Sequence, residues 1–408
     1  MNKETVDTLL GGMLESGEGV SDLLFIRGKP PLVEVHGQLH EFPWNETGPV
    51  LTSNFIEELA KYILDGNERW SIELEANGAC DCSYSVRDLA RFRVNIYKQN
   101  GRHAIVMRRF PAEIPTLDKL ALPPIFREII KERNGIILIT GAAGSGKTTT
   151  LAAMVNELNL SEKIHILTLE DPIEFLHPHR CAAISQRELG RDFPSFADGL
   201  RTALRQAPKV ILVGEIRDRQ SMEIALTASE TGHVVFSTLH TVNAGQTIQR
   251  ILGFFGRDEE EQVRQRLADT LRYIVSQRLV GKVDGGRLLV TEVVGNSLRT
   301  RETIRYGESE GKTFLEIIEA ASPLGWHTFD QGLLKAREAE LISEETALIY
   351  CTNKTKMRRD LDMLQRRQGV TDTHVPSGLK LDIVPPLKSA AASGVAPGQG
   401  RSGASSAA

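Results

Sequence analysis

Residues 141–148 have the types and the spacing of a loop that binds phosphate groups. They read GAAGSGKT, a full match to the pattern G-x-x-x-x-G-K-[ST]. The stretch GIILIT before them predicts a buried strand, and TTLAAMVNEL after them predicts a helix. Glycines let successive backbone N–H groups turn around phosphate oxygens, and the start of a helix adds free donors. The sequence therefore predicts binding of ATP or GTP.

Two side chains of this loop are expected to touch the nucleotide directly. Lys147 is placed to reach the β- and γ-phosphates, and the Thr148 hydroxyl is placed to coordinate Mg²⁺. The predicted nucleotide-binding residues are nine consecutive positions: Gly141, Ala142, Ala143, Gly144, Ser145, Gly146, Lys147, Thr148 and Thr149.

Polar clusters follow three further predicted strands. They are Glu170-Asp171-Pro172-Ile173-Glu174 after 164–169, Gly214-Glu215-Ile216-Arg217-Asp218 after 209–213, and His240-Thr241 after 234–239. Each acidic cluster alone is commonly a helix cap. Because the carboxyl ends of parallel strands share one edge of a sheet, we expect all three near the glycine loop. Together they supply what hydrolysis of a nucleotide needs: carboxylates near Mg²⁺, a base for water and a contact for the γ-phosphate.

Roles can be assigned within these clusters. We expect Glu215 to activate the attacking water and Glu174 to hold a water on Mg²⁺. Many nucleotide hydrolases have an aspartate that contacts Mg²⁺ just before this glutamate, but here the position is Gly214. The metal is therefore expected to depend on Thr148, the phosphates, and waters held by Glu174 or Glu215.

Two histidines bracket the strand predicted at 234–239. His240 follows the carboxyl end and is the predicted γ-phosphate contact. His233 precedes His240 by seven residues. Seven residues of strand span roughly 20 Å, so the two histidines cannot both contact one phosphate. His233 is expected at the far end of the strand, either at a subunit contact or as a structural histidine.

Composition narrows the class of protein. The chain has 408 residues and a net charge of −4, which argues against a nucleic-acid partner held by bulk charge. No apolar run has the length of a membrane span, and the N-terminal segment does not resemble a signal peptide. Four cysteines without a C-x-x-C pair indicate neither a zinc site nor a disulfide framework. We expect a cytoplasmic protein.

The chain divides into four predicted regions. Residues 1–110 form an α+β domain with helices at 3–15 and 54–65 and a hairpin turning at Asn100-Gly101. Residues 111–120, with two prolines, form a hinge. Residues 121–370 form a parallel sheet with helices on both faces, with helical patterns over 257–280 and 311–368. Residues 371–408 are rich in Ala, Gly, Ser and Pro and predict a disordered tail.

Four motifs in this chain resemble those of a known family. GAAGSGKTTTLAAM, ILTLEDPIEF, VILVGEIRD and ETGHVVFSTLHT resemble, in order and spacing, the Walker A motif, Asp box, Walker B motif and His box of the secretion-superfamily (GspE/PulE-like) ATPases. The family commonly has Gly at the position of Gly214. Within it, the chain resembles the retraction ATPases of type IV pili, of the PilT/PilU kind. SDLLFIRGKPPLVEVHGQL is similar to the opening domain of these proteins, and the resemblance covers roughly residues 5–365.

The resemblance implies a homohexamer that uses ATP and Mg²⁺ in twitching motility. Each subunit would join a PAS-like N-terminal domain to a RecA-like P-loop domain with C-terminal helices, with ATP between them. Arg93 and Arg108 match arginines that reach the phosphates from the N-terminal domain. Arg217 and Arg250 also match family positions and are weaker candidates for site residues. The implied partners are an inner-membrane platform protein of the pilus machine and a paralogous retraction ATPase. The implied location is cytoplasmic and peripheral at the inner membrane.

Other functions stay open at this point. Only Ile304-Arg305 within 300–312 match the AIRNLIRE-like segment of PilT-type proteins, so the chain resembles either the principal or the accessory, PilU-type, retraction ATPase. Pilus-extension and type II secretion ATPases usually carry a long N-terminal extension and a four-cysteine insertion, whereas only Cys351 follows Cys181 here. A RecA-like nucleic-acid motor would need a basic, aromatic-lined channel. A nucleotide-binding scaffold without turnover would not need Lys147, Glu174, Glu215 and His240 together.

Overall fold

The computed structural model describes residues 2–44, 50–86 and 89–367 of the chain. Its contacts divide it into two units, Met1–Leu361 and Asp362–Ala408. The predicted disordered tail at 371–408 lies outside the described residues. The segment from Asp362 to Arg367 continues the last helix, α14 (Lys354–Arg367).

The N-terminal part of the chain forms a six-stranded antiparallel sheet in the order β3-β2-β1-β6-β5-β4. Its strands are β1 (Val20–Phe25), β2 (Leu32–Val35), β3 (Gln38–Glu41), β4 (Ala79–Val86), β5 (Ala90–Gln99) and β6 (Arg102–Arg109). The helices of this part are α1 (Lys3–Glu15), α2 (Ser53–Leu64) and α3 (Glu68–Asn77). They supply apolar side chains to a core shared with the sheet.

Strand β5 shows how the sequence orients this sheet. Phe92, Val94 and Ile96 alternate along the strand and are buried in the N-terminal core. Successive side chains of a strand point to opposite faces, so Arg91 and Arg93 lie on the face turned away from that core. The turn between β5 and β6 is the predicted Asn100-Gly101 turn, and both residues have positive φ, at 50° and 70°. The register of this hairpin places Arg93 opposite Arg108.

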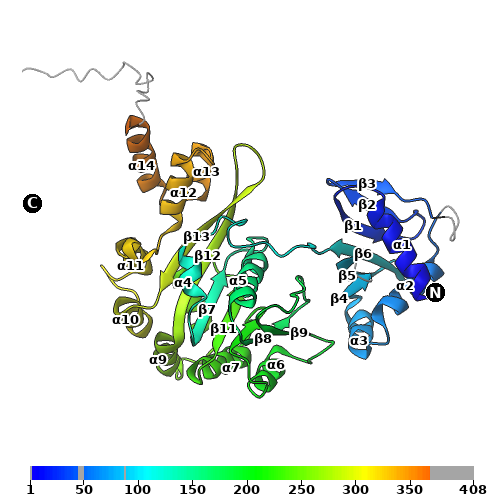
Figure 1. Ribbon diagram of the computed structural model, residues 1–408, viewed down its shortest axis with the longest axis horizontal. Helices are drawn as coiled ribbons and strands as arrows, with labels where there is room; N and C mark the ends of the chain where they lie inside the picture. Colours follow the sequence, from blue (N-terminus) through cyan, green and yellow to red (C-terminus); the bar gives the residue numbers. More distant parts are fainter. Residues whose placement is uncertain (1, 45–49, 87–88, 368–408) are drawn as a thin grey trace, which may run out of the picture. The chain divides into compact units, whose positions relative to one another are not determined.

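The second sheet has seven strands in the order β13-β12-β7-β11-β10-β8-β9. Its strands are β7 (Gly135–Thr140), β8 (His165–Glu170), β9 (Ala183–Glu188), β10 (Val210–Val213), β11 (Val234–Leu239), β12 (Leu271–Gly281) and β13 (Arg287–Gly295). Six of them are parallel, and β13 runs antiparallel to β12 beside it (Figure 1). The predicted strands 135–140, 164–169, 209–213 and 234–239 are therefore confirmed within one residue.

Helices cover both faces of this sheet, as predicted. Along β7, Ile136 and Leu138 enter one core, whereas Ile137 and Ile139 enter another. The first core includes residues of α6 (Phe196–Ala203), α7 (Arg219–Glu230), α8 (Ala244–Leu252), α9 (Glu260–Thr270), α10 (Leu298–Tyr306) and α11 (Phe314–Ala320). The second includes residues of α4 (Ile125–Ile129) and α5 (Lys147–Ser161). A strand buried on both faces reads as a continuous apolar run, which is what GIILIT is.

The C-terminal helices form a smaller core of their own. The elements after α11 are the 3-10 turn η2 (Ser322–Leu324) and the helices α12 (Phe329–Glu338), α13 (Glu344–Tyr350) and α14. Phe329 and Leu333 of α12 pack with Val280 and Val290 from the hairpin β12–β13. The prediction of several short helices over 311–368 is confirmed.

One predicted helix is wrong. Residues 257–280 were expected to be helical, but the helix α9 ends at Thr270 and the following residues form β12. The segment pairs with β7 on one side and β13 on the other. Strand β7 lies more than 100 residues earlier in the chain, so pairing with it in the folded protein overrides the local helical pattern. For the residues described, no helix combines the length and the apolar character that crossing a membrane requires.

Candidate nucleotide-binding site

A cavity of about 1000 Å³ lies where the glycine loop and the three polar clusters meet. The loop connects β7 to α5, and the clusters follow β8, β10 and β11, so all four come from neighbouring parallel strands. Predicted residues that line the cavity are Ala143, Gly144, Gly146, Lys147, Thr148, Thr149, Glu174, Glu215 and His240, together with Arg93 and Arg108. The structure therefore brings most of the predicted site together.

The glycine loop has the geometry of a phosphate cradle. Gly141 has φ 147°, and a Cβ there would lie 2.4 Å from the Ser145 hydroxyl oxygen, so no larger residue fits. Helix α5 begins at Lys147, and its N-cap Gly146 has φ 89° and offers no side-chain cap. The first N–H groups of α5 are thus left for an anion. The buried Ser145 Oγ has no partner among the described residues.

Lys147 is held inside this loop. Its Nζ donates to the carbonyl oxygens of Gly141 and Ala142, both at 2.9 Å. Burial lowers the pKa of the ammonium, and the Glu215 carboxylate opposes that effect. A buried ammonium gains most from a counter-charge, which phosphate oxygens supply.

Glu215 has two cationic or imidazole neighbours. Arg217 donates a close hydrogen bond to its Oε1, and His240 Nε2 lies 3.6 Å from its Oε2. The hydrogen bond raises the pKa of Arg217. The predicted water-activating carboxylate and the predicted γ-phosphate contact are therefore adjacent. Arg217, a weaker candidate from sequence, lines the cavity itself and also bonds with Glu215.

Gly214 has a structural reason to lack a side chain. Its N–H donates to Leu169 O at 2.8 Å, and a Cβ at this position would lie 3.3 Å from that same oxygen. The Thr238 hydroxyl also donates to Gly214 O at 2.7 Å. The ends of β8, β10 and β11 thus leave little room at this position for the aspartate of many nucleotide hydrolases.

Carboxylates on the β8 side of the cavity are electrostatically unusual. Burial raises the pKa of Glu174, whereas the nearby Arg93 lowers it. Burial also raises the pKa of Asp171, with Arg217 as the largest opposing influence. Glu170 is buried deeply enough for its pKa to rise to about 7, although Thr168 Oγ1 donates to it at 2.6 Å. These groups form a site where charge is costly without cations.

The two arginines of the N-terminal sheet reach the same cavity. Arg93 on β5 lies 3.5 Å from Asp81, and Arg108 on β6 donates from Nε to Asp22 at 2.9 Å. Asp22 is buried while the Arg108 side chain is 72% exposed, so the carboxylate anchors the base of a guanidinium that extends into open space. This arrangement suits contacts with an anion.

Five predicted residues lie outside the cavity lining: Gly141, Ala142 and Ser145 of the loop, and also His233 and Arg250. His233 precedes β11 and bonds through Nδ1 with Ala228 O at 3.1 Å, which places it at the far end of the strand as expected. Arg250 lies on α8 with its guanidinium carbon 5.0 Å from the centre of the Phe254 ring. Neither residue is among those that line the cavity.

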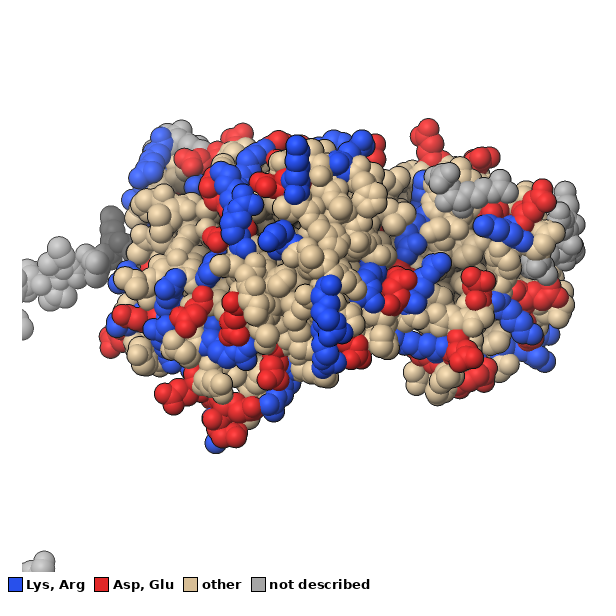
Figure 2. All heavy atoms as spheres, turned by 60° about the horizontal axis from the view of Figure 1, so that its bottom comes forward, with Lys and Arg blue, Asp and Glu red and all other residues tan. Residues whose placement is uncertain are grey.

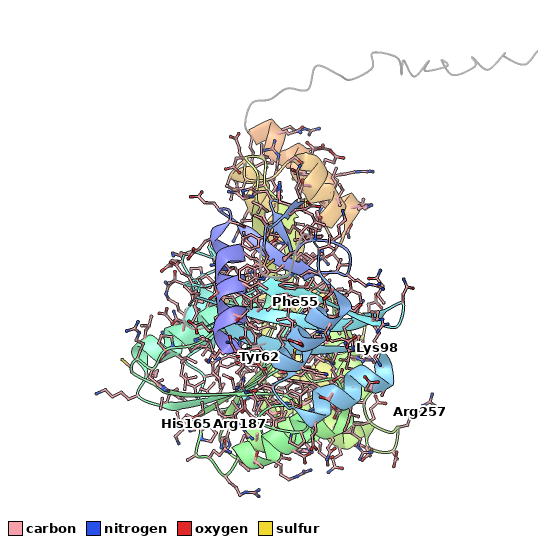
Figure 3. The ribbon with its side chains drawn as sticks, turned by 90° about the vertical axis from the view of Figure 1, so that its right-hand side faces the viewer. Phe55, Tyr62, Lys98, His165, Arg187 and Arg257 are labelled. Carbon is pink, nitrogen blue, oxygen red and sulfur yellow. The ribbon has the colours of Figure 1, made fainter. Side chains whose placement is uncertain are left out.

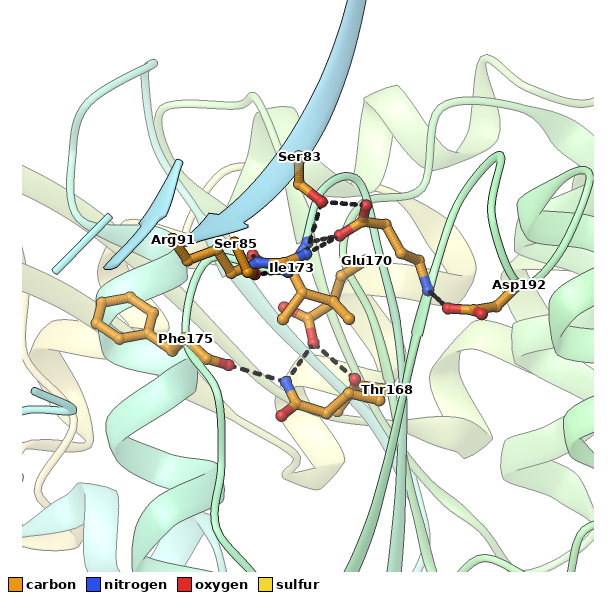
Figure 4. Close-up of polar contacts among 10 residues, drawn as sticks. Ser83, Ser85, Arg91, Thr168, Glu170, Ile173, Phe175 and Asp192 are labelled. Carbon is orange, nitrogen blue, oxygen red and sulfur yellow. Dashed lines mark hydrogen bonds and ion pairs between the residues drawn. The ribbon is translucent and has the colours of Figure 1, made fainter. Parts of the chain in front are cut away.

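Sequence reasoning missed a polar network on the rim of the site, drawn in Figure 4. Glu188 of β9 contacts Arg91 and Ser83 of the N-terminal sheet and the backbone N–H of Ile173. Gln186 of β9 bonds with Glu170. The sequence feature that could have pointed to this network is the alternation RFR in β5, because it places Arg91 on the same face as Arg93.

Thr148 and Glu174 are the residues that would hold Mg²⁺ beside a bound nucleotide. The described residues contain no cluster of three or more His, Cys, Asp or Glu side chains that could hold a metal by themselves. Thr148 and Glu174 both line the cavity and offer oxygen atoms, which Mg²⁺ prefers. When bound, Mg²⁺ neutralises the charge on phosphate oxygens. The face drawn in Figure 2 carries Lys, Arg, Asp and Glu in a mixed pattern.

Comparison with known proteins gives consistent matches. The model of a family described as "Type II/IV secretion system protein" matches residues 84–338. The chain is 38% identical over 332 residues to a Pseudomonas aeruginosa protein named "Type IV pilus retractation ATPase PilT", with 81% of this chain and 94% of that protein covered. It is 35% identical over 380 residues to the "Type IV pilus ATPase PilU" of the same organism, with 92% and 96% covered.

A solved structure has the same architecture. It is described as "Crystal Structure of the Pilus Retraction Motor PilT and Bound ADP", and it superposes with a TM-score of 0.74 at 38% identity. The match covers 88% of this chain and 98% of that one. The predicted fold class, a PAS-like α+β domain followed by a RecA-like P-loop domain with C-terminal helices, is confirmed.

Proposed function

Because the chain belongs to the type II/IV secretion system protein family, and within it to the PilT/PilU-like pilus retraction ATPases, we propose that it is an ATP-hydrolysing motor that drives retraction of type IV pili. The observation that supports this most strongly is one cavity lined by the glycine loop, by Glu174, Glu215 and His240, and by two arginines of the N-terminal sheet. A scaffold that only binds nucleotide needs the loop but not the rest.

The residues divide the work of hydrolysis among them. The loop N–H groups and Lys147 hold the β- and γ-phosphates in place. Glu215 accepts a proton from the attacking water or orients it, and Arg217 and His240 fix the position of its carboxylate. Arg93 and Arg108 offset the charge that develops on the γ-phosphate oxygens. Thr148 and Glu174 are the proposed contacts of Mg²⁺ and its waters.

The motor function requires that these steps move one part of the subunit against another. The proposed nucleotide contacts come from both sheets, which the segment 111–120 connects. Loss of the γ-phosphate removes the attraction for Arg93 and Arg108, which is a switch of the kind that nucleotide hydrolysis commonly operates. We further propose a homohexamer in the cytoplasm, attached to the inner membrane through the platform protein of the pilus machine, with a paralogous ATPase as a further partner.

The enzymatic part of this proposal is tested with Glu215→Gln. Removing the charge of the base while keeping its size should leave ATP affinity within about threefold and reduce turnover by 100-fold or more. Steady-state phosphate release and nucleotide binding, each with and without single-stranded DNA, are the measurements. Turnover at half the parent rate would move the base to another residue. Stimulation by DNA would favour a nucleic-acid motor instead.

The cellular part is tested by deleting the gene and counting pili. Deletion of a retraction ATPase leaves cells with excess surface pili and no twitching. Deletion of an extension ATPase leaves cells without pili. Complementation with the parent gene should restore twitching, and complementation with Glu215→Gln should not. Loss of pili in the deletion strain would contradict the retraction function. Excess pili only when a second, paralogous gene is also absent would identify the chain as an accessory motor.

A further inference from the structure

We infer that Arg91 is a positioning residue for hydrolysis, which fixes the segment that carries Glu174 from the N-terminal sheet. The inference rests on the proposed function, since it concerns the hydrolytic step. It assigns to Arg91 and Glu188 a task different from that of Arg93 and Arg108. Those two arginines line the nucleotide cavity, whereas Arg91 acts through the protein backbone.

Strand β9 holds the segment on both sides of Glu174. Glu188 Oε2 accepts from Ile173 N at 3.0 Å. Gln186 donates to Phe175 O at 2.8 Å and accepts from His177 N at 2.8 Å. Gln186 and Glu188 are two residues apart on the strand, so their side chains share a face. The residue before Glu174 and the residue after it are therefore both tied to one strand.

Arg91 completes a closed ring around Ile173 (Figure 4). Its Nε donates to Ile173 O at 2.9 Å, and its Nη2 forms a close ion pair with the same Glu188 oxygen that accepts from Ile173 N. Both backbone polar groups of Ile173 are thus bound, one by Glu188 and the other by Arg91. Ser83 supports the pair, since it donates to Glu188 Oε1 at 2.5 Å and accepts from Arg91 at 2.7 Å.

The burial of the ion pair indicates that its task is more than adhesion. The side chain of Glu188 is 2% exposed and that of Arg91 is 13% exposed. Taking two charges out of water costs nearly as much as their attraction returns, so a buried pair contributes little net stability. What such a pair does provide is a fixed geometry, because each partner is strongly penalised when the other leaves. Because both partners also bind the backbone of Ile173, the pair fixes the position of the residue next to Glu174.

The strand β9 itself is anchored within the ATPase sheet. It pairs with β8 along all six of its residues. His165 of β8 bonds with Ser185 at 2.9 Å, and Arg187 donates to Thr202 Oγ1 at 3.1 Å; both His165 and Arg187 are labelled in Figure 3. The movable partner in the ring is therefore Arg91.

Strand β5 consequently contributes two side chains with different tasks to the site. Arg91 and Arg93 lie two residues apart on the same face, the first bound to the Glu174 segment and the second lining the cavity. When β5 is seated, Glu174 is fixed and Arg93 is present. When β5 withdraws, Ile173 O loses its donor and Glu188 loses its cation, so the segment with Glu174 is held only by its bonds with β9. Hydrolysis is thereby restricted to subunits in which the N-terminal sheet is seated.

The test uses the full chain with the double variant Arg91→Gln/Glu188→Gln, which removes both charges and leaves no unpaired buried carboxylate. We expect kcat to fall by about tenfold or more, because small misplacements of a catalytic group are costly. The dissociation constant of a non-hydrolysable ATP analogue should stay within about threefold, since the glycine loop is untouched. Hydrogen exchange of peptides covering 171–177 should accelerate, while peptides of β7 and β10 keep their rates. Arg91→Lys keeps the charge but not the planar guanidinium group. Its kcat should therefore lie between that of the parent and that of the double variant.

Asn67→Ser is the matched control. Asn67 Nδ2 donates to Gly190 O at 3.0 Å, a contact between the start of α3 and the loop after β9, and does not touch 171–177. Serine keeps an oxygen to cap α3 but loses that amide donor. The control should keep parent turnover and exchange. If the parent hydrolyses ATP and the double variant keeps more than half of its kcat, or if exchange over 171–177 is unchanged, the inference is wrong and the proposed function stands. If the parent itself hydrolyses no ATP, the proposed function fails.

Discussion

Single residues in this protein are placed where burial makes their charge state matter. Lys147 illustrates this, because its ammonium is buried and bound only by two carbonyl oxygens of its own loop among the described residues. Neutral acceptors satisfy its hydrogen bonds but do not neutralise its charge. The side chain is therefore prepared for an anionic ligand, and its removal should affect binding before it affects catalysis.

We predict that Lys147→Ala lowers ATP affinity by 100-fold or more, because a charge-assisted bond to the β- and γ-phosphates is lost from a buried position. Titration with a fluorescent ATP analogue measures this directly. Lys131→Ala provides the control, since that lysine pairs with Glu128 on the surface. An affinity close to that of the parent would show that the glycine loop is not the nucleotide site.

Glu292 on β13 gives a prediction about pH. Its side chain is buried and accepts from Ala244 N at 3.2 Å, and burial raises its pKa from 4.5 to about 7. The folded state thus binds this proton more tightly than the unfolded state. The resulting stability is complete below about pH 4.5 and is lost as the pH rises toward 7.

In the variant Glu292→Gln, the side chain at position 292 is neutral at every pH. The variant therefore does not lose stability as the pH rises toward 7. Relative to the parent, its free energy of unfolding should rise by up to about 3 kcal/mol between pH 5 and pH 8. Thermal melting at several pH values, with Glu261→Gln on the exposed side of α9 as control, measures the difference. A constant difference across this range would mean that Glu292 does not titrate there.

Among the elements, the strand ends around Gly214 are the tightest part of the site. We predict that Gly214→Ala destabilises the protein by about 1–3 kcal/mol, because a Cβ would press on the backbone oxygen of Leu169 and a backbone cannot rotate away. Gly281→Ala at the end of β12 is the matched control, since a Cβ there meets nothing within 4 Å. Urea unfolding of the two variants should separate them. Equal stability would show that β8 and β10 can move apart.

Elements whose determinants are local could be predicted from the sequence. The loop between β7 and α5, the Asn100-Gly101 turn and the strands with polar clusters each follow from a short run of residues. Strand β12 could not be predicted, because its neighbours β7 and β13 decide its conformation. The pair of Arg91 and Glu188 was missed for a similar reason, since 97 residues separate them and only the folded chain brings them together.

At the scale of the whole molecule, the arrangement predicts nucleotide-dependent protection of the hairpin β5–β6. A non-hydrolysable ATP analogue should slow hydrogen exchange over residues 90–109 more than ADP does, because only the γ-phosphate attracts Arg93 and Arg108. Arg93→Ala should abolish the difference between the two nucleotides. Arg108→Lys is preferable to Arg108→Ala, since it keeps a partner for the buried Asp22. Equal protection by both nucleotides would remove the proposed switch.

The hairpin β5–β6 also has the dimensions of a lever. Arg93 and Arg108 face each other near its base, and continuous pairing runs from them to Gln99 and Arg102 beside the turn. Seven residues of extended strand between Arg93 and Asn100 span roughly 24 Å. A rotation of about 10° at the arginines would then displace the turn by roughly 4 Å. The loss of one phosphoryl group would thus move the far end of the hairpin by slightly more than the rise of one strand residue, which is about 3.3 Å.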